Sequence, residues 1–117
     1  MELKEGEYIR TKYGYIAKIE SIDNDIICCD SVIDFDYEES WVLLKDSFGD
    51  IIKHSFEIVD LIEKGDYVNG ELIREISPNG KVLFYLDYDT DKMIENGDIE
   101  RVLTKEQFNR GEYRINE

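Results

Sequence analysis

Long apolar runs, alanine and proline are scarce in this 117-residue chain, and each scarcity excludes a class of protein. No apolar run approaches the roughly 18–20 residues that a membrane-spanning helix needs, and no signal-peptide pattern opens the chain. We therefore expect a cytoplasmic protein that does not enter a membrane. There is one alanine, Ala17, against sixteen isoleucines, and one proline, Pro78. Because alanine is the best helix former and β-branched residues favour strands, this composition predicts a mainly β protein.

The residues that most often carry catalysis or bind zinc are also few. His54 is the only histidine, whereas nucleophilic triads and zinc sites need several suitable partners. Cys28 and Cys29 are the only cysteines, and their spacing fits neither a zinc knuckle nor a redox pair. As neighbours on a strand they would point to opposite faces, so we expect no mutual disulfide and at least one core thiol. The chain also lacks Gly-rich phosphate loops, and we expect no enzyme and no cofactor.

One segment weakly resembles a calcium-binding loop. Asp87, Asp89 and Asp91 alternate as do the first ligands of an EF-hand, which continues with a glycine and ends in glutamate. Here Lys92 occupies the glycine position and Asp98 the last one. The lysine charge would oppose a cation, so a solvated loop is the favoured interpretation and no metal site is predicted.

The charge of the chain is its most unusual property. Twenty-eight acidic residues against fourteen basic ones give a net charge of −14, and both halves of the chain are negative. Phosphate backbones would be repelled, which disfavours direct binding of nucleic acid. Two interpretations remain open: the charge only keeps the protein soluble, or it forms an acidic surface that engages the basic groove of a nucleic-acid-handling protein.

The segment 34–39 is the best candidate for such a surface. Alternation on a strand would place its carboxylates on one face and Phe35 and Tyr37 on the other. The carboxylates could then imitate the spaced phosphates of nucleic acid while the aromatic rings anchor the strand. The alternative is a charged edge strand that prevents aggregation. The predicted acidic strip consists of Asp34, Asp36, Glu38 and Glu39.

Hydrophobic patterning predicts short strands joined by tight turns. Asn69-Gly70 and residues 77–80 are strong turn signals. Residues 54–61 fit a strand or a short helix equally well, and 87–96 read as a polar excursion. Thr104 and Gln107 form a capping-box pattern that predicts a helical turn through Phe108. Trp41, the only tryptophan, is expected to be buried. The predicted strands are 7–10, 15–22, 26–29, 41–44, 67–68, 72–76, 81–86, 99–103 and 113–115.

A motif occurs twice in the chain. Gly6-Glu7-Tyr8-Ile9 recurs as Gly65-Asp66-Tyr67-Val68, and Ile16 and Ile19 align with Ile73 and Ile76. This Gly-acid-Tyr-aliphatic pattern followed by a loop and a strand resembles the opening of SH3-like small barrels, in which a helical turn often precedes the last strand. The resemblance implies tandem SH3-like barrels at 1–62 and 63–117, with one fused β structure as the alternative, and one or two short helical turns.

The whole chain also resembles small phage and prophage proteins of low-GC Gram-positive bacteria. The segments that carry this resemblance are 55–62, 65–70 and 103–108. Some such proteins act against host defence systems, and the resemblance supplies no catalytic residues.

The sequence therefore leaves three functions open. The leading one is an acidic protein-binding module, in the form of a phage-type inhibitor that engages a basic host protein. The alternative is a protein that sequesters a small molecule or nucleotide in an aromatic cleft between its halves. Its candidate residues are Tyr15, Tyr37, Tyr85 and Tyr88. The third is a structural phage component. The partner, the ligand and the oligomeric state stay open.

Overall fold

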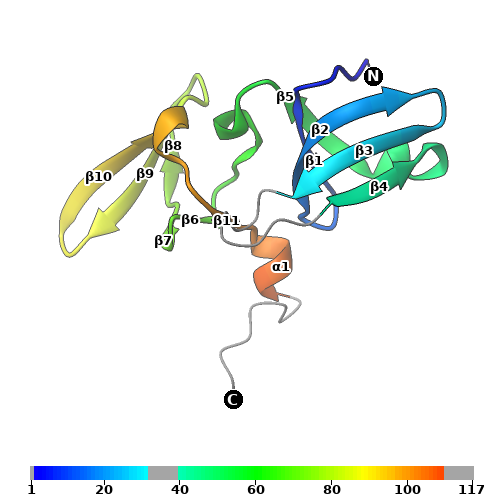
Figure 1. Ribbon diagram of the computed structural model, residues 1–117. Coiled ribbons are helices and arrows are strands. Elements are labelled where there is room, and N and C mark those ends of the chain that lie inside the picture. The colour runs from blue at the N-terminus through cyan, green and yellow to red at the C-terminus, as the bar shows by residue number, and fades with distance from the viewer. Residues whose placement is uncertain (1, 32–39, 110–117) are drawn as a thin grey trace.

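The computed structural model describes residues 2–31 and 40–109 of the chain, with the side chains of Ser31, Ser40, Trp41 and Lys45 also left undescribed (Figure 1). Over these residues the protein is mainly β, as the composition predicts. The described strands form three antiparallel sheets, accompanied by short 3-10 turns and one five-residue helix.

The first half forms a five-stranded sheet with the order β4-β3-β2-β1-β5. A 3-10 turn, η1 (Lys45–Asp50), leads directly into the last of these strands. The inward side chains of the sheet include Ile9, Ala17, Ile19 and Ile27, which are completely or almost completely buried. The strands are β1 (Tyr8–Thr11), β2 (Ile16–Asp23), β3 (Ile26–Ser31), β4 (Ser40–Leu44) and β5 (Ile51–Ser55).

The second half forms two three-stranded sheets with the orders β11-β6-β7 and β10-β9-β8. Its strands are β6 (Tyr67–Val68), β7 (Glu71–Leu72), β8 (Glu75–Ile76), β9 (Val82–Asp87), β10 (Thr90–Glu95) and β11 (Val102–Leu103). The remaining elements are the 3-10 turns η2 (Ile58–Leu61) and η3 (Asn96–Asp98) and the helix α1 (Lys105–Asn109).

The two halves pair their strands in the same order. In the first half, β1 pairs with both β2 and the last strand β5, and in the second, β6 pairs with both β7 and β11. A 3-10 turn comes before β5 and before β11, the last described strand of the second half, and Tyr8 and Tyr67 each open the first strand of their half. The predicted strand 113–115 lies outside the described residues. The described strands form no closed barrel, so the assignment to SH3-like barrels stays a prediction.

Hydrogen bonds around the repeated motif correct the sequence alignment. The Gly6 N–H donates to the carbonyl of Ile19 at 2.9 Å, and the Gly65 N–H donates to the carbonyl of Ile73 at 3.0 Å. Both glycines have positive φ, +92° and +96°, which glycine adopts without strain. The counterpart of Ile19 is therefore Ile73, and its alignment with Ile76 is wrong. The second hairpin turns tightly at Asn69-Gly70, so it is shorter than the alignment allowed.

Several local predictions are confirmed. Asn69 and Gly70 both have positive φ, 55° and 86°, as a tight type I′ hairpin turn requires. In the 77–80 turn, the Gly80 N–H donates to the carbonyl of Ser77 at 2.8 Å. The capping box forms, because the Gln107 N–H donates to Thr104 Oγ1 and the Thr104 N–H donates to Gln107 Oε1, both at 3.4 Å.

Other local predictions are wrong or incomplete. Residues 87–96 are not an irregular excursion, because β9 runs through Asp87 and returns as β10. Only Ile94 of β10 is buried, and that explains why the strand reads as polar. Residues 54–61 contain both a strand end and a short helical turn: His54 and Ser55 end β5, and η2 follows. The predicted strand 72–76 is divided between β7 and β8.

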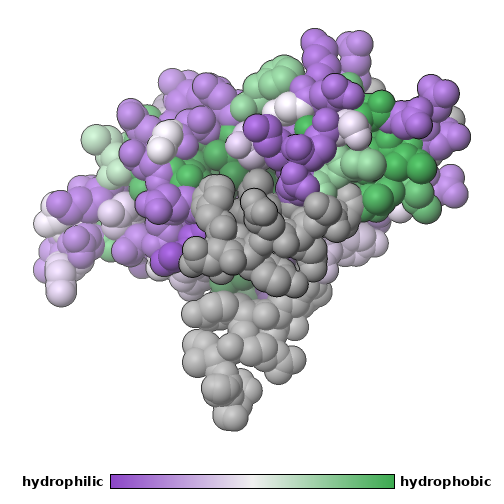
Figure 2. All heavy atoms as spheres, in the orientation of Figure 1, coloured by the Kyte–Doolittle hydropathy of each residue, from purple (hydrophilic) through white to green (hydrophobic). Residues whose placement is uncertain are grey.

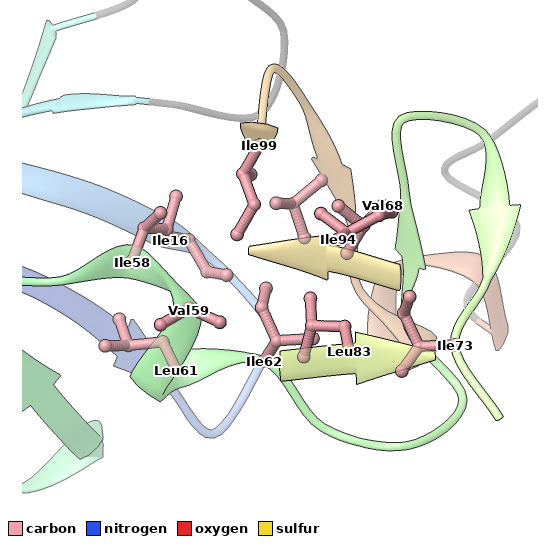
Figure 3. Close-up of a cluster of buried hydrophobic side chains, with 11 residues drawn as sticks. Ile16, Ile58, Val59, Leu61, Ile62, Val68, Ile73, Leu83, Ile94 and Ile99 are labelled. Atoms are coloured by element: carbon pink, nitrogen blue, oxygen red, sulfur yellow. The ribbon is translucent and has the colours of Figure 1, made fainter. Parts of the chain in front are cut away.

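Two hydrophobic clusters make up the core. One lies within the first half and includes Ile9, Ile19 and Ile27. The other combines the second half with η2 and with Ile16 of β2 (Figure 3). Ile16 thus projects from the first sheet into the core of the second half. Because Ile16 and η2 bury their side chains in the cluster of the second half, the two halves pack against each other.

Candidate functional site

A buried cluster of charges lies where the two halves meet. Arg10 of β1 is 0% exposed. It points from the same face of the sheet as Ile16, its partner in the register. Its Nη1 donates to Asp66 Oδ2 and, at 2.9 Å, to the carbonyl of Leu61. Its Nη2 donates to Asp66 Oδ1 at 3.0 Å and to Glu106 Oε1 at 2.7 Å. One guanidinium therefore binds η2 together with Asp66 and Glu106 of the second half.

Asp66 is the second member of the cluster and is also completely buried. Besides the bidentate contact with Arg10, it accepts hydrogen bonds from the N–H groups of Glu63 at 2.7 Å and Lys105 at 3.0 Å. Both carboxylate oxygens are therefore satisfied, as a buried charge requires. The equivalent acid of the first motif, Glu7, accepts from the N–H of Lys4 at 2.8 Å, so the repeated acid fixes the same turn in both halves.

Glu63 connects the buried cluster to the surface. Its carboxylate lies 3.8 Å from Arg10, 3.2 Å from Lys53 and 2.9 Å from Lys105. Burial alone would raise the pKa of Glu63, but the hydrogen bond from Lys105 and the charges of Arg10 and Lys53 outweigh it and lower the pKa. Burial would likewise lower the pKa of Arg10, yet its bonds to Asp66 raise it. Glu63 and Arg10 thus stay ionised at neutral pH.

A close backbone approach lies beside the charges. Thr104 Oγ1 donates to the carbonyl of Gly14 at 2.8 Å. A Cβ added at Gly14 would lie 2.3 Å from Thr104 Oγ1 and 2.8 Å from Glu106 Cβ. Only glycine leaves enough room for the two segments to meet at this distance.

The cluster is built to hold the halves together. A ligand cannot reach Arg10 in this arrangement, because the guanidinium has no exposed surface and both Nη atoms are already bonded to protein oxygens. Only its Nε lacks a hydrogen-bond partner among the described atoms. The sequence signal was the repeat itself, which marks Asp66, but nothing in the sequence indicates that Arg10 is its partner 56 residues away.

The predicted acidic strip lies outside the described residues. This applies to Asp34, Asp36, Glu38 and Glu39, and to the aromatic candidate Tyr37. The side chain of Trp41 is likewise not described, while its backbone pairs with Cys29 in the sheet. The strip and the burial of Trp41 both stay predictions.

The other three aromatic candidates do not line one shared concavity. Tyr85 lines two concavities of the second half, of about 300 and 510 Å³, and neither of these two is lined by Tyr15 or Tyr88. Tyr88 is 95% exposed at the turn between β9 and β10, with φ of 63°. Tyr15 precedes β2 in the first half and is 38% exposed.

The aspartates of the calcium-loop pattern lie in the β9–β10 hairpin. Asp87 and Asp91 lie on opposite strands of the β9–β10 hairpin and Asp89 in its turn, which differs from a calcium-binding loop between helices. Among residues 2–31 and 40–109, no three potential metal-ligating side chains gather at one point.

His54 Nδ1 lies 2.9 Å from Glu7 Oε2. The prediction of a core thiol is confirmed, because Cys29 is buried, which raises its pKa to about 12, while Cys28 is exposed.

One surface was missed at the sequence level. Four outward side chains at one end of β3 and β4 are apolar and exposed: Ile26, Cys28, Val42 and Leu44. Figure 2 shows hydrophobic surface gathered on the right of the molecule, where Figure 1 places these strands. The available signal was that Ile26 to Cys29 is apolar at every position, although an exposed sheet face usually alternates with polar residues.

Comparisons with known proteins give no relative. No family model matches the chain, and neither the curated proteins nor the solved structures contain a match. Within the part of the chain that the structure describes, no helix is both long and apolar enough to cross a membrane.

Proposed function

We propose that this protein is a non-enzymatic, acidic protein-binding module that engages a partner with a basic surface. The observation that carries the proposal is the net charge of −14 on a small β protein. Such a field steers oppositely charged partners and speeds their association.

The distribution of cations supports this proposal. Many of the basic side chains already bind carboxylates within the molecule, so they contribute little positive potential outside it. Arg10 is buried, and the others form ion pairs at or near the surface. The paired cations are Arg10, Lys12, Lys53, Lys64, Lys81 and Lys105.

We also propose that each half is an SH3-like small barrel. The shared pairing order and the 3-10 turn before each last strand support this assignment. The phage-type setting and the role of an inhibitor of a nucleic-acid-handling protein are proposed from the sequence resemblance alone.

The test compares two variants with equal charge change. In the strip variant, Asp34, Asp36, Glu38 and Glu39 become Asn or Gln. In the control variant, Asp87, Asp89, Asp91 and Glu100 of the second half are changed in the same way. Each immobilised protein is offered a lysate of a low-GC Gram-positive bacterium, with and without competing duplex DNA.

The proposal predicts a basic protein that the wild type and the control capture, that the strip variant loses, and that duplex DNA displaces. Equal loss of capture by both variants would indicate unspecific charge attraction. It would contradict the hypothesis that the acidic strip imitates nucleic-acid phosphates. The four control carboxylates are exposed, and exposed charges contribute little to stability. Melting curves confirm that both variants are folded.

A second candidate function rests on the smaller concavity of about 300 Å³. Arg74 lines it beside Phe84 and Tyr85, and the acids Glu75 and Asp91 also line it. A ring could stack on the aromatic side chains while a single anionic group binds Arg74. Titration with nucleoside monophosphates, followed by tyrosine fluorescence, tests it. Binding by the wild type that Arg74→Gln abolishes would favour this function over the first.

A further inference from the structure

The outward apolar surface of β3 and β4 is the most unusual exposed feature in the described chain. Val42 and Leu44 of β4 are 54% and 57% exposed, and Ile26 of β3 is 38% exposed. They face the same side of the sheet, since Ile26 is in register with Leu44 and Cys28 with Val42. We call these four residues the outer strip.

The outer strip shares its sheet face with a surface that is already covered. Cys28 and Ile26 alternate with the buried Cys29 and Ile27, so they point away from the core of the first half. Arg10 and Ile16 also point outward, further along the sheet, and there the second half buries them. The face is therefore covered by protein at Arg10 and Ile16, whereas the outward residues further along β2 and the outer strip of β3 and β4 are exposed.

Acidic residues lie next to the outer strip. Asp23 is in register with Ile26, and Asp46 comes two residues after Leu44. A cation on this face, Lys18, is in register with Asp30, two residues beyond Cys28. An apolar centre with an acidic rim complements a partner segment that carries apolar side chains between lysines or arginines. A second copy of this chain is a poor occupant, because two proteins of charge −14 repel each other.

We propose that the outer strip is the docking surface for a basic amphipathic segment of the partner, an inference that rests on the proposed function. The apolar side chains of that segment cover Ile26, Val42 and Leu44, and its cations face the neighbouring carboxylates. Occupancy should then bury the thiol of Cys28.

Cys28 makes occupancy measurable without an identified partner. A maleimide should react with the exposed Cys28, while Cys29 serves as an internal reference, since burial raises its pKa to about 12 and keeps it a thiol. The probe is a peptide of alternating leucine and lysine. Its two controls alternate leucine with glutamate and serine with lysine.

With the leucine–lysine peptide at ten times its Kd, labelling of Cys28 should slow about tenfold, because only the free fraction reacts. The double variant Val42→Ser/Leu44→Ser should bind this peptide more weakly than the wild type does. The matched control Leu86→Ser/Met93→Ser, at exposed positions of β9 and β10, should bind it unchanged. Melting curves confirm that both variants fold.

Four outcomes are distinguishable. Protection by the leucine–lysine peptide alone supports the docking surface. Binding of both lysine peptides without protection of Cys28 overturns the docking surface but leaves the proposed function standing. Binding of neither lysine peptide overturns both. Protection that grows with protein concentration, without peptide, overturns the inference in favour of a second copy.

Discussion

At the scale of single residues, the junction depends most on Arg10. Replacing it by methionine removes the charge that compensates the buried Asp66. We expect Arg10→Met to lower the free energy of unfolding by about 3–5 kcal/mol, the usual cost of leaving one partner of a buried pair alone. Urea denaturation followed by circular dichroism measures this change.

The control for this variant is Lys12→Met, two residues away. Lys12 forms an exposed pair with Asp50 at 3.2 Å, so its removal should leave stability nearly unchanged. The double variant Arg10→Met/Asp66→Asn should recover part of the loss, since the completely buried carboxylate is then neutral and only the partly exposed Glu106 loses its cation. Equal small losses from Arg10→Met and Lys12→Met would show that the buried cluster does not hold the halves together.

Gly14 tests the close approach of the two halves. Gly14 and Gly80 both have positive φ, +89° and +76°, but an added Cβ collides with Thr104 only at Gly14 and meets no described atom within 4 Å at Gly80. Gly80→Ala should therefore cost only the backbone strain, about 1–2 kcal/mol. Gly14→Ala should cost about 1–3 kcal/mol more because of overpacking. Equal melting temperatures for the two variants would argue against the contact.

Glu63 should make stability depend on acid pH. Its pKa is lowered in the folded protein from an ordinary 4.5, so its contribution is complete above that value and is lost as pH falls through the folded pKa. The variant Glu63→Gln should be less stable than the wild type at pH 7, and this difference should shrink towards pH 3. Unfolding by urea across this range measures it, and a difference independent of pH would contradict the assignment.

At the scale of elements, the β9–β10 hairpin carries strain at its turn. Tyr88 has φ of 63° and is 95% exposed, and a left-handed conformation disfavours a residue of this size. Asparagine adopts it more readily. Tyr88→Asn should therefore stabilise the protein by about 0.5–1 kcal/mol, measured by thermal and urea unfolding. A destabilised variant would mean that the tyrosine ring makes contacts that outweigh the strain.

Local signals in the sequence predicted those elements whose causes are local. The turns at Asn69-Gly70 and residues 77–80 and the capping box at Thr104 depend on residues within a few positions of each other. By contrast, β10 was missed because only Ile94 faces the core. The equivalence of Ile19 and Ile73 was missed because the length of the hairpin loop, and not the similarity of the residues, sets the register.

The candidate sites could be predicted less well than the fold. Asp66 lies in a visible motif, yet its partner Arg10 is distant in sequence and looks like any charged strand residue. The outer strip was missed because an apolar strand reads as buried whichever face is covered. Which face stays open depends on where the second half docks, and that is a property of the tertiary structure.

At the scale of the whole molecule, two similar β halves form one structural unit. The claim rests on the buried Arg10–Asp66 contact and on the core that Ile16 and η2 share with the second half. Halves joined in this way should not unfold separately, since unfolding of either half would expose the cluster that contains Ile16 and η2 and would break the buried Arg10–Asp66 contact.

Differential scanning calorimetry of the intact protein tests this claim most directly. We predict a single transition whose calorimetric and van't Hoff enthalpies agree, and a transition that shifts to lower temperature in Arg10→Met. Two resolved transitions in the wild type, or a calorimetric enthalpy well above the van't Hoff value, would show that the halves unfold independently and would contradict the account.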